Sequence, residues 1–215
     1  MRKFIGLLLI LSGCVLLGLS ARLLLLNENE NLDAKQASAQ GVTALHTVIS
    51  ARTKHETKLP EIYREDVPAE PLAKEDIPYE AETVQLDGTR YIGILALPTL
   101  GLELPVAARW SYPQLKSTPC RYYGSAETGD LVICGHNYSA VFGHLKDLHL
   151  GDPVYLTEAD GTLHSYAVSV YEILEPTDIA KMTESGAALT LYTCTYGGQQ
   201  RVTIRCTEIP HTAEQ

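Results

Sequence analysis

The stretch LTLYTCTYGGQQRVTIRC, residues 189–206, predicts two β-strands joined by a short turn. Residues 190–193 are β-branched, aliphatic or aromatic, which favours a strand that ends at Cys194. Residues 201–206 alternate between polar and apolar side chains, the pattern of a strand with one buried face. The two glycines at 197 and 198 are a turn signal, so the strands are expected to pair as an antiparallel hairpin.

Such a hairpin would place the thiol of Cys194 and the guanidinium of Arg201 at neighbouring positions. A thiol beside a fixed cation is a better nucleophile, because the cation stabilises the thiolate. A guanidinium can also donate hydrogen bonds to an oxyanion that forms on an attacked carbonyl. His136, in the segment CGHN at residues 134–137, is a candidate proton carrier. A lone cysteine is more often a small buried hydrophobe, so spacing alone leaves both interpretations open.

Three motifs resemble those of sortases, the cysteine transpeptidases of Gram-positive cell surfaces. TLYTC at residues 190–194 resembles the TLxTC signature, and Arg201 matches the position of the family's essential arginine. LVICGHN at residues 131–137 resembles the family strand that ends in a Gly-His pair. The motifs occur in the family's order, and the resemblance extends over about residues 88–210.

The resemblance implies that Cys194 attacks the carbonyl of a threonine in a substrate's C-terminal sorting signal. It implies that Arg201 holds the oxyanion, that His136 moves the proton, and that the thioacyl enzyme passes its acyl group to an amine. The expected partners are surface proteins with a sorting signal and an acceptor amine on a cell-wall precursor or a pilin. Thr193 and Tyr196 are the candidate substrate-binding residues, although Thr193 could instead orient the site. No cofactor is implied.

Several alternatives stay open. Arg205 shares a strand face with Arg201 and is the rival oxyanion donor, but Arg201 lies nearer the turn and matches the motif. The pair His136-Asn137 favours a class B enzyme, whereas the short turn leaves class B-like and class D-like both possible. A surface cysteine peptidase that only hydrolyses is a second candidate, disfavoured because His136 precedes Cys194 in the chain. The third candidate is a non-catalytic binding module on a β-barrel.

Composition limits the choice of function. A chain of 215 residues suits one globular domain with appendages. The net charge of -9 disfavours a nucleic-acid partner, which needs a basic face. Five cysteines without paired spacing indicate neither a zinc site nor a dense disulfide framework, and no acidic cluster indicates calcium, so no metal is expected. Cys134 and Cys206 are predicted to be buried thiols, and whether Cys120, Cys134 or Cys206 forms a disulfide stays undecided.

The N-terminus carries a candidate membrane anchor. Arg2 and Lys3 precede an uncharged apolar run at residues 4–21, whose helical length approaches the ~30 Å of a bilayer core. Arg22 could snorkel to the interface and let residues 23–26 complete the span. Residues 1–26 are therefore predicted to be a single-pass anchor with a cytoplasmic N-terminus and the rest outside the cell. A cleaved signal peptide and a lipoprotein are the rival interpretations, because small residues at 37–39 and the LSGC segment at 11–14 resemble processing sites.

Residues 27–85 are predicted to connect the anchor to the domain. A thin helical stripe formed by Leu32, Val42, Leu45, Val48 and Ile49 indicates a juxtamembrane helix or stalk. Residues 56–82 are acidic and rich in proline, which predicts an extended linker that holds the domain away from the membrane.

Residues 86–215 are predicted to form the catalytic barrel. The five strands expected before the last hairpin lie at residues 91–98, 101–107, 130–135, 154–157 and 162–170. Residues 109–129 and 177–184 are expected to hold short helices or loops, residues 171–176 to leave the sheet, and Phe142, Leu145 and Leu148 to lie on a short helix packed against the barrel. Many short strands with little helix point to a mainly β, closed barrel, which the sortase resemblance sets at eight strands.

Overall fold

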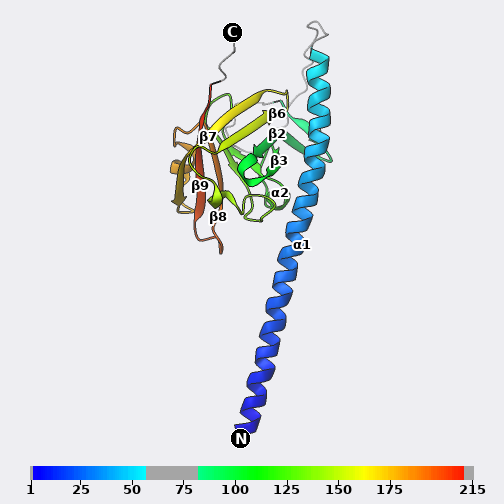
Figure 1. The fold of residues 1–215 in the computed structure, drawn as a ribbon, viewed down its shortest axis with the longest axis vertical. Helices are drawn as coiled ribbons and strands as arrows, with labels where there is room; N and C mark the ends of the chain where they lie inside the picture. Colours follow the sequence, from blue (N-terminus) through cyan, green and yellow to red (C-terminus); the bar gives the residue numbers. More distant parts are fainter. Residues whose placement is uncertain (1, 57–81, 211–215) are drawn as a thin grey trace, which may run out of the picture.

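The computed structural model describes residues 2–56 and 82–210 of the chain. A single long helix, α1 (Arg2–Glu56), runs along one side of a small β-barrel that occupies the rest of the described chain (Figure 1). The predicted linker falls almost entirely on residues 57–81, which lie outside the described residues.

Eight strands close the barrel. Each pairs with the next in the order β2 (Thr89–Leu97), β3 (Leu102–Ala107), β4 (Cys120–Tyr123), β5 (Leu131–Cys134), β8 (Leu189–Cys194), β9 (Arg201–Glu208), β7 (Leu163–Leu174) and β6 (Pro153–Glu158). The ring closes because β6 also pairs antiparallel with β2. A ninth strand, β1 (Val84–Leu86), pairs antiparallel with β2 and lies outside the ring. The structure confirms the predicted closed eight-stranded barrel.

The pairing of β2 with β6, which we call the closing seam, depends on a glycine. Gly93 lies where the β2–β3 register shifts, and it is also the partner of Glu158 on β6. A Cβ at this position would stand 2.1 Å from the carbonyl oxygen of Thr157 and 2.8 Å from the Cα of Glu158. Both contacts are with backbone, which cannot move without opening the ladder, so the seam requires glycine here.

The barrel interior is filled mainly by aliphatic side chains, together with Tyr166 and Phe142. Phe142 and Leu145 are fully buried, and Leu148 is nearly so. These three side chains pack on the barrel as their spacing predicts, but the segment forms only a short 3-10 turn, η2 (Leu145–Asp147). The other short elements are η1 (Pro98–Leu100), α2 (Tyr112–Ser117) and α3 (Ile179–Thr183).

Two strand predictions need correction. β4 forms inside the stretch that was expected to hold only turns and a helix, and its four residues pair with β5 on one side and through a single residue, Cys120, with β3 on the other. β7 does not leave the sheet after Val170, because residues 171–174 pair with residues 201–204 of β9. A bulge between Val168 and Val170 interrupts the side-chain alternation, which is why the sequence pattern ends too early there.

Helix α1 packs against the barrel through part of the apolar stripe that the sequence predicts. Val42, Leu45 and Ile49 are buried in a cluster with Val84, Ile94 and Ala159, whereas Leu32 is exposed. A hydrogen-bonded pair between His46 Nε2 and Glu103 Oε1, 2.6 Å long, supports the contact with β3. The expected stalk is therefore a helix, but it packs against the domain before the linker begins, so the linker alone does not set the position of the barrel.

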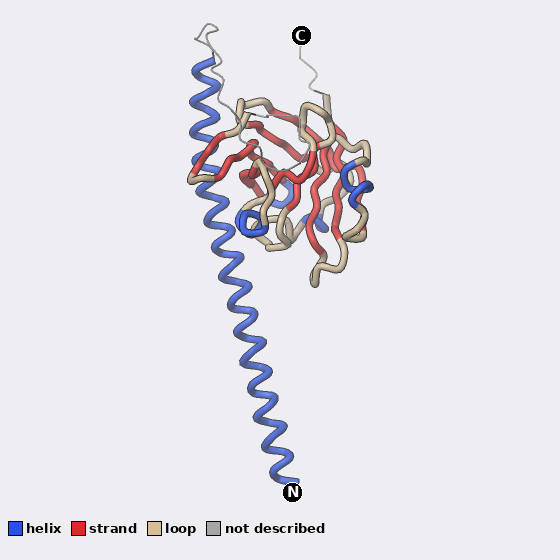
Figure 2. Tube along the Cα trace, turned by 180° about the vertical axis from the view of Figure 1, so that it is seen from behind, coloured by secondary structure: helices blue, strands red, loops and turns tan. Residues whose placement is uncertain are grey.

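The N-terminal half of α1 projects away from the barrel (Figures 1 and 2). Its large apolar side chains from Val15 to Leu26 are exposed, several of them by more than 60%. Within the described part of the chain, no helix meets the length and apolarity of a membrane span. The anchor predicted at residues 1–26 thus stays a prediction.

Candidate active site

Cys194 and Arg201 face each other at one end of the β8–β9 hairpin. They are the last register pair of the two antiparallel strands, and both side chains are partly exposed. The predicted hairpin therefore forms, and it places residues 194 and 201 opposite each other in the ladder.

The six-residue turn between them is closed by its own hydrogen bonds. Thr195 N donates to Gln200 O over 2.9 Å, and Gln200 N donates to Thr195 Oγ1 over 3.0 Å. Gly197 and Gly198 have φ values of 83° and 74°, in the left-handed region that favours glycine. Arg201 Nη1 donates to the carbonyl oxygens of Gly198 and Gln200, each over 3.1 Å, so its guanidinium stays at the mouth of the turn.

His136 reaches the same end of the barrel from β5. Strands β5 and β8 are parallel neighbours, with Cys134 opposite Tyr192. The ladder continues one step further, because Gly135 N donates to Tyr192 O over 3.1 Å and the buried Thr193 Oγ1 donates to Gly135 O over 2.9 Å. The backbone of His136 therefore follows directly beside the end of β8, where Cys194 begins the turn.

The imidazole of His136 lies in a half-buried site against an aromatic ring. Its ring stacks on Tyr138 with centroids 3.9 Å apart and planes tilted by 30°. Its Nδ1 atom is buried and has no hydrogen-bond partner among the described residues. Burial lowers the pKa of His136, the ammonium of Lys116 lowers it further, and the carboxylate of Glu30 partly offsets both.

Arg205, the rival oxyanion donor, is occupied elsewhere. It is buried, and it donates to Glu172 Oε1 over 2.7 Å, to Thr190 Oγ1 over 2.9 Å and to the carbonyl oxygens of Lys181 and Met182. With its donors used to tie β9 to α3 and β8, Arg205 is a structural residue. Arg201 is the arginine that remains beside Cys194.

The two candidate substrate-binding residues differ in exposure. Thr193 is buried, and its hydroxyl is bonded to Gly135, which favours a role in orienting the site. Tyr196 is fully exposed at the tip of the turn, where it could contact a substrate. A shallow hollow beside Arg201 is lined from the other side by residues of the 175–182 segment, including Glu175 and Met182.

The remaining barrel cysteines are buried free thiols, as predicted for Cys134 and Cys206. Burial raises the pKa of Cys120, Cys134 and Cys206 to about 12 in each case, so these thiols stay protonated and unreactive near neutral pH. Across the described ranges, no group of three or more His, Cys, Asp or Glu side chains is arranged to hold a metal ion.

Sequence reasoning missed the residues that surround His136. Tyr138 lies two positions after it, but nothing in the pattern shows that its ring turns back onto the imidazole. Glu30 comes from α1 and Lys116 from α2, and the contact between Glu30 and Tyr138 joins positions 108 residues apart. The polar stretch that contains Glu30 gives no periodic signal that could have revealed this.

The comparisons with known proteins agree with this geometry. The family model for the sortase domain matches residues 95–209, which is more than half of the chain and includes all three motifs. No curated protein matches the sequence significantly. The chain belongs to the sortase family and is accordingly a sortase-type cysteine transpeptidase.

Solved structures show the same fold. Sortase C1 from Streptococcus agalactiae is 25% identical, with a TM-score of 0.51 over 59% of this chain and 72% of that one. A Clostridium perfringens sortase D5 transpeptidase is 14% identical, with a TM-score of 0.55 over 81% and 99%. A lid mutant of sortase A from Corynebacterium diphtheriae is 22% identical, with a TM-score of 0.51 over 80% and 96%. Because these neighbours span classes A, C and D, the class of this chain stays open.

Proposed function

We propose that this transpeptidase cleaves the C-terminal sorting signal of a surface protein and joins the new acyl end to an amine of a cell-wall precursor or a pilin. The proposal assigns the nucleophile to Cys194, the proton carrier to His136 and the oxyanion donor to Arg201. The observation that carries it is the pairing of Cys194 with Arg201 across the β8–β9 turn, with His136 beside the end of β8.

In the first step the Cys194 thiolate forms a bond to the threonine carbonyl carbon of the sorting signal. The charge that develops on the carbonyl oxygen is stabilised by the guanidinium of Arg201. As the peptide C–N bond breaks, the imidazolium of His136 gives its proton to the departing amine. A thioester to Cys194 remains.

In the second step an acceptor amine attacks the thioester carbon. The nitrogen loses its proton to His136, the C–S bond breaks, and the Cys194 thiolate is restored. The covalent intermediate lets an amine compete with water for the acyl group, which is why a transpeptidase uses one.

The proposal also places the barrel on the outer face of the cell membrane, anchored by residues 1–26. Two observations support it: a basic N-terminus ahead of an apolar run, and exposed apolar side chains between Val15 and Leu26 that no part of the described barrel covers. Retention of the full chain in the membrane pellet after alkaline carbonate washing is the expected result, and release by that wash would contradict the anchor.

The test of the reaction is a transfer assay with a library of sorting-signal peptides and candidate amines, followed by mass spectrometry of the products. Cys194→Ala is expected to abolish transfer while the thermal unfolding midpoint stays unchanged, because the thiol is partly exposed at a strand end. Cys14→Ser is the matched control, since it removes the exposed thiol of α1 and should leave transfer intact. Transfer that persists in Cys194→Ala rules the proposal out.

The same assay separates transfer from hydrolysis. A transpeptidase yields an amide with the acceptor and little free acid when an amine is supplied, whereas a surface peptidase yields the acid regardless of the amine.

A further inference from the structure

Within the described ranges, the second ring nitrogen of the proposed catalytic histidine has no hydrogen-bonded partner. In catalytic triads a third group bonds the second ring nitrogen and orients the imidazole. Here His136 Nδ1 is buried without a partner among the described residues, and the contact that holds the ring is its stack on Tyr138. The position of the imidazole therefore depends on what fixes Tyr138.

Tyr138 is fixed from two directions. Its carbonyl oxygen accepts hydrogen bonds from Val141 N and Gly143 N, at 2.9 and 2.8 Å, which hold its backbone in a tight turn. Its ring is buried, and the phenol hydroxyl donates a hydrogen bond to Glu30 Oε2 on α1. The other oxygen of the Glu30 carboxylate accepts from Lys116 Nζ of α2 at 3.3 Å.

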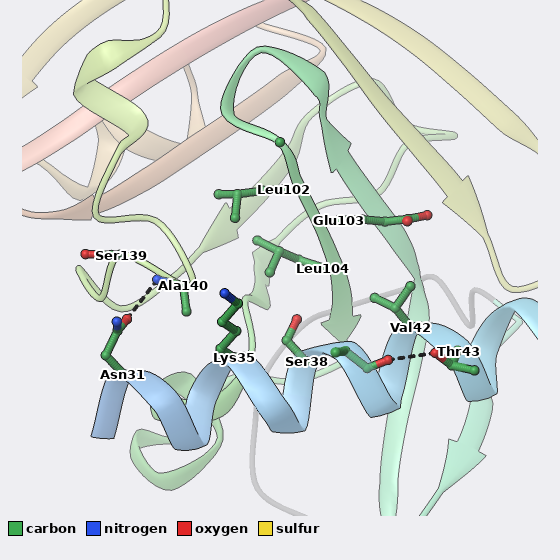
Figure 3. Close-up of a pocket in the computed structure, with 12 residues that line it drawn as sticks. Asn31, Lys35, Ser38, Val42, Thr43, Leu102, Glu103, Leu104, Ser139 and Ala140 are labelled. Atoms are coloured by element: carbon green, nitrogen blue, oxygen red, sulfur yellow. Dashed lines mark hydrogen bonds between the residues drawn. The ribbon is translucent and has the colours of Figure 1, made fainter. Parts of the chain in front are cut away.

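The next helix residue makes a second link to the same loop. Ala140 N donates to Asn31 Oδ1 over 2.9 Å (Figure 3). Two consecutive residues of α1, Glu30 and Asn31, thus hold Tyr138 and Ala140, which lie two and four positions after the proposed proton carrier. We call these two bonds the helix clasp.

The clasp lies apart from the apolar cluster of α1 around Leu45. Between Asn31 and the buried Val42 lies an open pocket of about 550 Å³, into which Lys35 and Ser38 project toward Leu102 and Leu104 of β3 (Figure 3). Beside this pocket the contact with the barrel continues, because Ala34 packs into the barrel core and Ser38 is buried. Glu30 is exposed and outside both apolar clusters, so the clasp can be altered without removing the cluster around Leu45.

We propose that Glu30 and Tyr138 are positioning residues for His136, so that the docked N-terminal helix forms part of the catalytic machinery. This inference rests on the proposed function of His136. The carboxylate holds the phenol, the phenol places the ring, and the ring sets the imidazole beside the end of β8. The helix thereby determines how well the proton carrier is aligned for both acyl-transfer steps.

The charges around the imidazole predict opposite shifts in the pKa of His136 for two substitutions, which a merely structural clasp would not produce. The groups that act on the His136 ring are Glu30 on α1, Lys116 on α2 and Tyr138 in its own loop. Glu30 raises the pKa of His136 and Lys116 lowers it. Glu30→Gln should therefore lower the pKa of His136, and Lys116→Gln should raise it, although both substitutions break the same ion pair.

The test uses the detergent-solubilised full chain with the Cys14→Ser background. The rate of acyl transfer is measured with the peptide and amine that the parent chain accepts, and the pH profile of Cys194 is measured by alkylation with iodoacetamide. Glu30→Gln and Tyr138→Phe are each expected to slow transfer about tenfold, because a small displacement of the reacting groups is costly. The double variant should be no slower than either single one, since both remove the same hydrogen bond.

Glu28→Gln is the matched control, because it removes the same charge from an exposed position on the same helix. The alkylation profile of Glu30→Gln should move to lower pH, and that of Lys116→Gln to higher pH. If Glu30→Gln and Glu28→Gln behave alike in both measurements, or if Glu30→Gln and Lys116→Gln shift the profile in the same direction, the inference is wrong. If the parent chain transfers no peptide, the proposed function fails instead, and the alkylation profiles still decide the role of Glu30.

Discussion

Two arginines four positions apart on β9 have opposite surroundings. Arg201 is partly exposed at the turn beside Cys194, whereas Arg205 is buried and bonded to Glu172, Thr190 and the α3 backbone. In the sequence both lie on the same face of a strand. Motif position favours Arg201, and the hydrogen bonds add a physical reason, because they occupy the donors of Arg205.

These surroundings predict opposite effects of the same substitution. Arg201→Lys keeps the charge but loses the planar donors, so transfer should fall by about 10²-fold or more with stability unchanged. Arg205→Lys should lower the free energy of unfolding by about 2 kcal/mol, because buried charge-assisted hydrogen bonds are lost. Denaturant unfolding and transfer rates measure the two effects. Loss of transfer in Arg205→Lys at unchanged stability would reverse the assignment.

The lowered pKa of His136 also predicts a pH dependence of stability. Because burial disfavours the imidazolium, the unfolded chain binds more protons than the folded one just below the ordinary histidine pKa of about 6.5. His136 therefore costs stability as the pH falls through that region and costs nothing well above it. Between pH 8 and pH 5 the thermal unfolding midpoint of the parent chain should fall more than that of His136→Gln. Parallel curves for the two proteins would show that burial of the imidazole carries no such penalty.

At the scale of elements, the sequence predicted most strands but missed a short strand, the end of a long strand and the pairing that closes the barrel. The final hairpin, the strand before His136 and the barrel class follow from alternation, turn residues and motif order. β4 begins three residues after helix α2, in a stretch whose composition favours turns, and the end of β7 is concealed by a bulge. The pairing of β2 with β6 that closes the ring is a long-range contact, which no local pattern encodes.

The closing seam gives the prediction that belongs to this scale. Gly93→Ala should lower the free energy of unfolding by about 3 kcal/mol, because the added methyl group meets the backbone of β6. Gly88→Ala is the control: its surroundings are open and only its positive φ is unfavourable, so about 1 kcal/mol is expected. Denaturant titration compares the two, and equal losses would mean that the seam tolerates a side chain.

At the scale of the whole molecule, the chain is more integrated than its sequence indicates. Composition divides it into an anchor, a stalk, a linker and a domain, and the thin apolar stripe of α1 gives little sign of a partner. In the structure the stripe packs on β1 and β2, and Glu30 reaches the loop that follows His136. The sequence could not predict the contact near the site, because Glu30 is polar and lies 108 positions before Tyr138.

The unbroken course of α1 from Arg2 to Glu56 has a geometric corollary. Each residue of an α-helix adds 1.5 Å of rise and 100° of rotation. In a chain held at its first turns, the direction that the proposed active site faces is therefore coupled to its distance from those turns along the helix axis. One residue inserted near position 27 would rotate the proposed active site about the helix axis by about 100° and raise it by only about 1.5 Å. Seven inserted residues would raise the site by about 10 Å and leave it facing within about 20° of its original direction.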